Sequence, residues 1–85
     1  MSYIIEAVQT DGYSGGYLAN INGEVRFVHS AWSAFKFSET ANIEGIISSL
    51  KKFKELYPST RFYKFEIQTY VPGRVGGLVR AVIVD

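Results

Sequence analysis

The fold of this chain is decided by its middle, which runs from Ser38 to Pro58 and reads SETANIEGIISSLKKFKELYP. Apolar side chains recur there at intervals of three and four residues, the period of one face of an α-helix. They are Ala41, Ile43, Ile46, Ile47, Leu50, Phe53, Leu56 and Tyr57. Ser38 is a good N-cap because its hydroxyl can accept a hydrogen bond from a free helix N–H, and Pro58 ends the pattern. We therefore expect one amphipathic helix.

Before the helix, the sequence predicts three strands. Residues 3–10 are rich in β-branched and aromatic types. Residues 17–21 and 24–29 flank Asn22-Gly23, a dipeptide that favours the tight type I′ turn of a β-hairpin. This turn sets a register that places Leu18 opposite Phe27 and Ala19 opposite Arg26.

After the helix, two more strands are expected. Residues 61–71 alternate as in a half-buried strand. One face carries Tyr63, Phe65, Ile67 and Val71, and the other carries Lys64, Glu66 and Gln68, with Phe62 and Tyr70 on the same face as Lys64. A turn around Pro72, extended by Gly76-Gly77, leads to a last strand over 78–84. On that strand Val79, Ala81 and Ile83 share a face.

The layout is therefore βββαββ, an α+β fold in which an antiparallel sheet of about five strands carries one helix on one face. No linker or repeat divides the sequence, so residues 1–85 are expected to form a single domain. Residues 11–16 indicate a flexible turn. Residues 30–37 either extend the third strand or cross over to the helix.

Composition excludes several classes of function. The chain has no cysteine and one histidine, His29, so it cannot supply a tetrahedral zinc site. Its eight acidic residues are scattered singly, and neither glycine-containing loop leads into the helix as a phosphate-binding loop does. We expect no catalytic residue, no metal and no cofactor. Without a signal-like N-terminus or a long apolar run, the expected location is the cytoplasm, away from membranes.

The net charge of +1 conceals a difference between the two halves. Residues 1–50 carry two basic and five acidic side chains, a balance of −3, whereas residues 51–85 carry seven basic and three acidic side chains, a balance of +4. An ordinary dipolar surface would explain this, but basic residues interleaved with Phe62 and Tyr70 also suit single-stranded RNA. The candidate nucleic-acid-binding residues are Lys51, Lys52, Lys54, Arg61, Lys64 and Arg74.

The chain also carries more large apolar side chains than one helix can shield. Exposed apolar surface on a small protein marks an interface, and Tyr and Trp are favoured anchors there. The candidate interface residues are Tyr13, Tyr17, Trp32, Phe35, Phe62 and Tyr70. The alternative is that residues 31–37 fold over the second face of the sheet and cover it. The sequence favours an interface, in a homodimer or in a complex with another protein.

Residues 34–41, AFKFSETA, and the helix end Leu56-Tyr57-Pro58 resemble small accessory proteins of tailed, T4-type bacteriophages, which act in host takeover and anti-defence. The resemblance covers residues 17–70. It implies a hairpin, a helix opened by Phe-Ser, and a closing strand or hairpin. It also implies an antitoxin-like inhibitor of a host or defence factor, such as a toxin endoribonuclease, in the host cytoplasm. It transfers no functional residue.

The sequence thus predicts a non-enzymatic interaction protein, an inhibitor of phage type that occupies a partner's functional surface. The alternative is an RNA-binding module that uses the basic C-terminal half, and a small enzyme comes third.

Overall fold

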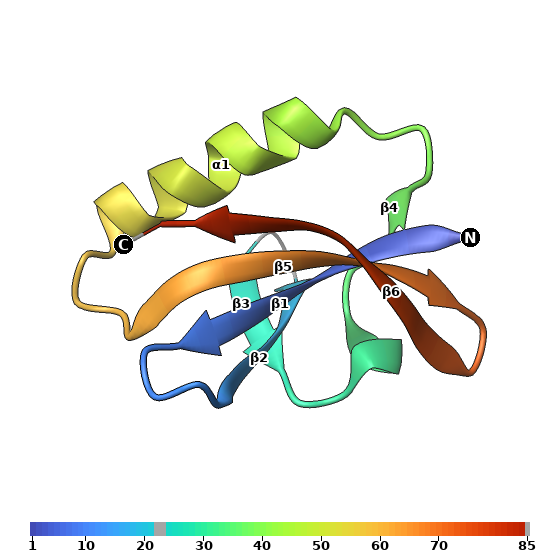
Figure 1. The fold of residues 1–85 in the computed structure, drawn as a ribbon, viewed down its shortest axis with the longest axis horizontal. Coiled ribbons are helices and arrows are strands. Elements are labelled where there is room, and N and C mark those ends of the chain that lie inside the picture. The colour runs from blue at the N-terminus through green and yellow to red at the C-terminus, as the bar shows by residue number, and fades with distance from the viewer. Residues whose placement is uncertain (22–23, 85) are drawn as a thin grey trace.

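Residues 1–21 and 24–84 are described by the structure, a computed structural model, and they form an antiparallel sheet, one α-helix and one short 3-10 helix (Figure 1). The elements are β1 (Ser2–Gln9), β2 (Ser14–Ile21), β3 (Glu24–Val28), the 3-10 helix η1 (Ala31–Ser33), β4 (Phe37–Ser38), α1 (Ile43–Leu56), β5 (Phe62–Val71) and β6 (Arg74–Ile83). The predicted α+β fold and its βββαββ order are confirmed, with β4 as a short additional strand.

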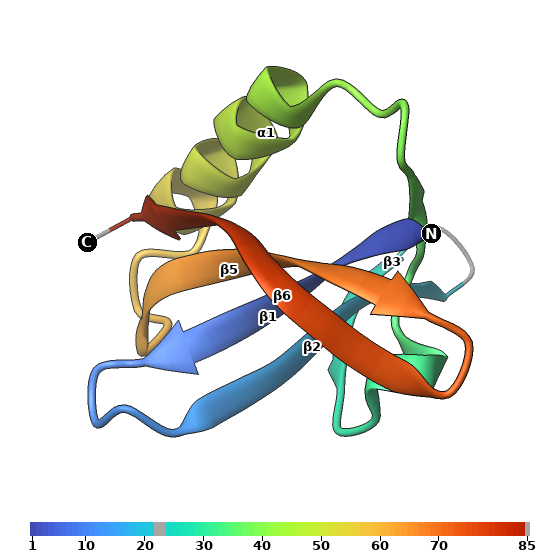
Figure 2. The ribbon, with the colours of Figure 1, turned by 45° about the vertical axis from the view of Figure 1, so that its right-hand side comes forward.

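The sheet has the strand order β3-β2-β1-β5-β6, and every neighbouring pair is antiparallel. β1 lies at its centre, and β4 pairs with the first two residues of β1. The helix α1 lies over one face, while the loop that carries η1 passes beneath the other (Figures 1 and 2). The predicted hairpin register is confirmed, since Leu18 pairs with Phe27 and Ala19 with Arg26. The Asn22-Gly23 turn itself lies outside the described residues.

The main core lies between α1 and the sheet. Its fully buried side chains come from the central strands β1 and β5, and Ile47 and Leu50 of the helix pack onto them. Four phenylalanine rings extend this core toward β3, with Phe27 making edge contacts to Phe53 and Phe62 at centroid distances of 5.8 and 4.8 Å. Such edge contacts each add about 1 kcal/mol beyond the area they bury.

The helix begins later than the sequence predicts. Asn42, not Ser38, is the N-cap, and its side-chain oxygen accepts a hydrogen bond of 3.2 Å from the Gly45 N–H. Ser38 is instead part of β4, where it pairs with Ser2. The sequence pattern could not show this because the pairing joins residues far apart in the chain. Gly45 lies close to the cap, since an added Cβ would sit 3.3 Å from the Asn42 amide nitrogen.

A β-bulge in β5 changes which residues face the helix. Val8 pairs with Lys64 but Gln9 pairs with Phe62, so Tyr63 is an extra residue in the ladder. Phe62 therefore packs into the helix-side core with Phe65, and the prediction that Phe62 shares a face with Lys64 and Tyr70 was wrong. Gly15 of β2 makes room for this ring, because a Cβ there would overlap it.

Two strand boundaries and one strand face also differ from the prediction. β2 begins at Ser14 and β6 at Arg74, so Gly15 and Gly16, and Gly76 and Gly77, all predicted to be in turns, lie inside strands. Val82 of β6 and Val84, which follows the strand, reach the core, while Val79, Ala81 and Ile83 are exposed. Two irregularities in the β5–β6 ladder, near Val79 and near Gly76-Gly77, account for the shifted face.

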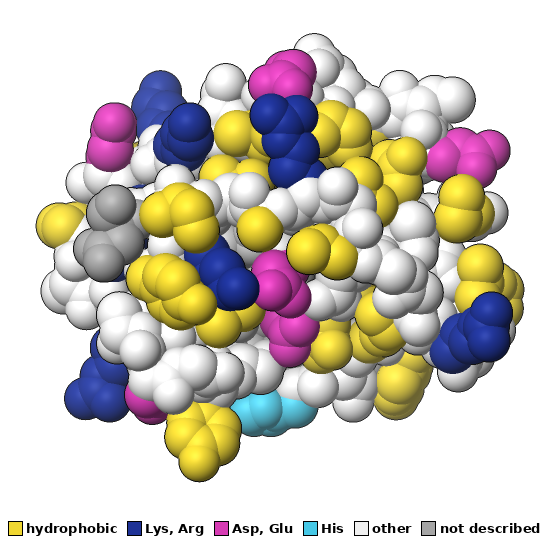
Figure 3. Space-filling model, in the orientation of Figure 1, with side chains coloured by type: hydrophobic (Ala, Val, Ile, Leu, Met, Phe, Trp, Pro, Cys, Tyr) yellow, Lys and Arg dark blue, Asp and Glu magenta, His cyan; other side chains and the backbone are white. Residues whose placement is uncertain are grey.

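The second face of the sheet is covered in part. Ile4, Ala34 and Tyr70 form a small buried cluster, against which Tyr17 and Ala31 pack. The alternative prediction, that residues 31–37 cover the second face of the sheet, is thus confirmed only near η1. Large hydrophobic side chains elsewhere remain exposed, and Figure 3 shows several on the side that β6 crosses. Within the described residues, α1 and η1 are both too short and too polar to cross a membrane.

The position of the helix cap can be tested directly. Replacing Asn42 by alanine removes the side-chain acceptor for the Gly45 N–H and should lower the free energy of unfolding by about 1 kcal/mol. Ser38→Ala is the control and should change it by less than about 0.5 kcal/mol. Urea unfolding of both variants measures the difference, and an equal loss in the two would contradict the assignment.

The contact between Gly15 and Phe62 predicts a second effect. Gly15→Ala should destabilise the fold by about 1–3 kcal/mol, because the Phe62 ring is held by Phe27 and Phe65 and cannot swing away. The double variant Gly15→Ala, Phe62→Leu should lose less than the sum of the single losses. Thermal unfolding gives the three values, and strict additivity would rule out the contact.

Candidate functional site

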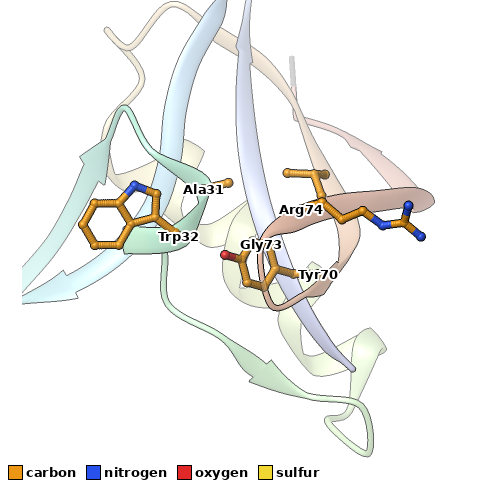
Figure 4. Close-up of a pocket in the computed structure, with 6 residues that line it drawn as sticks. Ala31, Trp32, Tyr70, Gly73 and Arg74 are labelled. Atoms are coloured by element: carbon orange, nitrogen blue, oxygen red, sulfur yellow. The ribbon is translucent and has the colours of Figure 1, made fainter.

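The candidate site is an open cleft of about 370 Å³ between η1 and the turn that joins β5 to β6. It is lined by Ala31, Trp32, Tyr70, Gly73, Arg74 and Val75. In Figure 4 the Tyr70 ring lies in the middle, with its hydroxyl toward η1. Trp32 and Arg74 extend to opposite sides of the opening, so they form its two flanks.

The flank that carries Arg74 and Val75 is shaped by a tight turn. Pro72 and Gly73 connect two long paired strands, and Gly73 has a φ of +92°, which side-chain-bearing residues rarely adopt. The sequence therefore needs glycine here, and the turn presents the next residue, Arg74, at its tip.

The flank that carries Trp32 is held by backbone hydrogen bonds and by Lys36. The Ser33 and Ala34 N–H groups donate to the carbonyls of Ser30 and Ala31, both at 3.1 Å. The Lys36 ammonium donates to the carbonyls of Trp32 and Ala34, and it lies 5.0 Å from the centre of the Tyr70 ring. These contacts fix the η1 backbone while leaving the Trp32 side chain free.

Exposure separates the roles of the two aromatic rings. Trp32 is 73% exposed, although Trp is among the residues most often withdrawn from water, whereas Tyr70 is only 9% exposed and forms the base of the cleft. Trp, Tyr and Arg are the three types most enriched among residues that dominate binding energy at protein interfaces. This cleft places one of each together on a fixed backbone.

The predicted interface residues do not form one surface. Trp32 and Tyr70 meet in the cleft, and Phe35 is partly exposed against Phe37 at a centroid distance of 4.8 Å. Tyr13 is exposed in the β1–β2 turn, away from the cleft. Tyr17 packs on the small second-face cluster, and Phe62 belongs to the main core.

The predicted nucleic-acid-binding residues are dispersed and partly engaged. Lys54 donates to the carbonyls of Thr60 and Phe62 at 2.7 and 2.9 Å, so it closes the loop after the helix. Lys64 pairs with Glu66 at 3.1 Å. Arg74 is the first residue of β6, and Figure 1 shows the start of that strand at the opposite end of the sheet from the end of α1. The remaining three candidates, Lys51, Lys52 and Arg61, are exposed.

The sequence analysis missed a polar cluster on the second face of the sheet. Glu6 and Glu66 are direct cross-strand partners, and the Gln68 amide nitrogen donates to both carboxylates, at 2.9 and 3.2 Å. Two like charges in such positions destabilise a sheet unless a donor or a cation lies between them. Gln68 and Lys64 supply these groups. Scattered acids in a sequence reveal such a pair only once β1 is known to lie beside β5.

The surroundings of this cluster raise the pKa values of two side chains, Lys64 and Tyr17. The hydrogen bond to Glu66 is the main reason that the pKa of Lys64 lies above its ordinary value. Burial, and then the nearby Glu6 carboxylate, raises the pKa of Tyr17. The cluster therefore keeps lysine charged and tyrosine neutral, which is a structural arrangement, because neither group is brought toward the pH range where it could exchange protons.

A larger hollow of about 710 Å³ lies between β3 and the end of α1. Its lining is mostly rings that already pack on one another, namely Phe27, Phe53, Tyr57 and Phe62. The polar side chains among its lining residues are Glu24, Thr60 and Tyr57, the last through its hydroxyl. It is better understood as the margin of a core that the helix does not fully cover.

Catalytic and metal chemistry find little support in the described residues. His29 is exposed just after β3, at the lower edge of the view in Figure 3. Residues 1–21 and 24–84 hold no group of three or more side chains suited to bind a metal ion. No protein-family model, curated protein or solved structure matches this chain. The resemblance to phage accessory proteins therefore stays a prediction.

The polar cluster predicts a pH-dependent contribution from Lys64. Because its pKa is raised in the folded state, the charged lysine stabilises the fold at neutral pH, and this contribution is lost as the pH rises through that pKa. Lys64→Met should therefore unfold at a lower temperature than the wild type near pH 7, and the gap should narrow in strongly alkaline buffer. Lys52→Met on the helix surface is the control. A gap that stays constant with pH would refute this account.

Proposed function

We propose that this chain is a non-catalytic protein-binding module whose main contact is the cleft between Trp32 and Arg74. The observation that carries the proposal is Trp32 itself. A largely exposed tryptophan on a backbone fixed by Lys36 has little role in the fold, since it leaves most of its apolar area in water.

The chemistry of the cleft indicates the kind of segment it would accept. The rings of Trp32 and Tyr70 offer apolar area, and the guanidinium of Arg74 on the opposite flank offers paired donors for a carboxylate. Lys36 adds positive charge beside Tyr70. The matching partner segment presents an apolar or aromatic side chain next to an acidic one.

We further propose that such binding is inhibitory, as the resemblance to phage accessory proteins implies. An inhibitor needs only to occupy its partner's functional surface, and a rigid cleft on a small domain suits that role. RNA binding has less support, because Lys54 and Lys64 are already engaged within the chain, and the start of β6, which carries Arg74, lies at the opposite end of the sheet from the end of α1.

Trp32 offers both the test and its readout, because it is the only tryptophan in the chain. A random peptide library selected against the immobilised protein should yield peptides in which an aromatic residue adjoins an acidic one. Their binding should shift the Trp32 fluorescence to shorter wavelength. Trp32→Ala should weaken their binding by about 30-fold or more, the loss of roughly 2 kcal/mol typical of a dominant interface residue.

The matched control is Tyr13→Ala, which removes an equally exposed ring outside the cleft. This variant should bind the selected peptides as the wild type does. Arg74→Ala should weaken binding chiefly for peptides that carry the acidic residue. Both Trp32→Ala and Tyr13→Ala should leave the unfolding temperature nearly unchanged. Selected peptides that bind Trp32→Ala and the wild type equally well would overturn the proposal.

A further inference from the structure

The outer edge of β6 is open. β6 pairs with β5 on one side and, within the described residues, with no strand on the other. It is ten residues long, and its exposed hydrophobic side chains are Val75, Leu78, Val79 and Ile83. A long apolar edge of this kind presents unpaired N–H and C=O groups that pair readily with another extended chain.

The opposite edge of the sheet shows the contrast. β3 has five residues, and it carries Glu24 and Arg26 in an ion pair of 2.8 Å. Short length and charged side chains are the usual ways in which a sheet edge is protected from pairing. β6 is twice as long, and the stretch between its two charged residues carries no charge: Arg74 lies at its start, and Arg80 is paired with Glu44 of α1 at 2.7 Å.

Gly77 is a second and independent observation. Its neighbour Gly76 has an internal reason to be glycine, because an added Cβ would overlap the Thr69 hydroxyl. At Gly77, by contrast, an added Cβ would meet no atom of the described residues within 4 Å, and φ lies outside the left-handed region. Glycine inside a strand lowers stability, and it often marks a bulge, as at the ladder irregularity near Gly76-Gly77, or a place where another backbone approaches closely. The chain itself supplies no such neighbour at Gly77.

We propose that β6 pairs with β6 of a second copy of this chain, antiparallel and across a two-fold axis close to Leu78. When two copies of one strand pair antiparallel, a two-fold axis relates them, so each copy contributes the same surface, as a two-fold dimer requires. An axis at Leu78 places Arg80 opposite Gly76 and Arg74 opposite Val82. Each arginine therefore faces an uncharged residue, whereas an axis at Gly77 would set Arg74 opposite Arg80.

The position of α1 permits this pairing. Glu44 near the helix start binds Arg80, and Lys51 and Pro58 line a hollow with Ile83 and Val84, so the helix follows β6 from Arg80 toward its end. With an axis at Leu78, the two helices begin on either side of the axis and run away from each other. Their exposed lysines would not meet, and the two sheets would join into one.

This pairing goes beyond the proposed partner binding. It uses the backbone edge of β6, whereas the cleft uses side chains; Arg74 and Val75 of β6 belong to both surfaces, but Trp32 and Tyr70 lie outside β6 and belong to the cleft alone. One can therefore fail without the other.

Light scattering over a concentration series tests the dimer. The wild type should have the mass of two chains. Leu78→Lys, which adds a charge at the proposed axis, and Gly77→Val, which adds bulk where the second backbone would approach, should each raise the dissociation constant at least about tenfold. Val25→Lys is the matched control at the β3 edge, because Val25 and Leu78 are similarly exposed, at 54% and 58%. It should remain a dimer, and circular dichroism should show all variants folded.

The absence of cysteine allows a direct check of the geometry. Leu78→Cys should form a disulfide-linked dimer on mild oxidation, because directly opposed residues in an antiparallel pair bring their Cβ atoms to about 4.5–5.5 Å. Val25→Cys should not. A monomeric wild type would overturn the proposal and show that the irregularities in β6 protect its edge. A dimer that survives Leu78→Lys would overturn it by placing the interface elsewhere. A monomer that still binds the selected peptides through Trp32 would leave the proposed function intact.

Discussion

The structure depends on how little of a five-strand sheet one helix can cover. α1 has fourteen residues and is about 21 Å long, but an α-helix with its side chains is only about 10–12 Å wide. Five strands spaced about 4.8 Å apart span roughly 19 Å. The helix therefore covers about half of one face. Phenylalanine rings must extend the core toward β3, and the loop after β3 must turn back to cover part of the other face.

That arrangement explains where apolar side chains remain in contact with water. The second-face cluster is small, and Trp32, although it belongs to the loop that forms this cluster, remains outside it and exposed. At the other margin, β6 contributes Val82 to the core and leaves most of its remaining length exposed. The surplus of apolar residues that the sequence shows is thus divided into a cleft and a strand edge. These two surfaces call for different partners, since a cleft receives side chains and an edge receives a backbone.

Local patterns predicted the local structure well. The helical stripe placed Ile47 and Leu50 in the core, and Asn22-Gly23 gave the hairpin register through the rules of tight turns. The failures all depend on contacts between distant residues. Ser38 resembles a helix cap but is drawn into β4 by pairing with β1, and the extra residue Tyr63 appears only when β5 is aligned with β1. The candidate site, too, was predictable from the sequence only in part. Composition drew attention to Trp32, but only the fold shows that Val75 lies beside it and that Arg74, predicted to bind nucleic acid, lines the same cleft.

The central place of β1 bears on how the chain acquires its structure during synthesis. Among the strands of this sheet, β1 is made before all of its partners, and one of them, β5, is made last but one: Ser2 pairs with Tyr70. Pairings between such distant segments form slowly because a long loop must close first. Until β5 emerges, the apolar side chains of β1 can pack only against the β2–β3 hairpin, β4 and α1. Until β5 is made, the nascent chain would therefore expose the apolar side chains and unpaired strand edges of an incomplete sheet, a state in which chaperones are commonly needed.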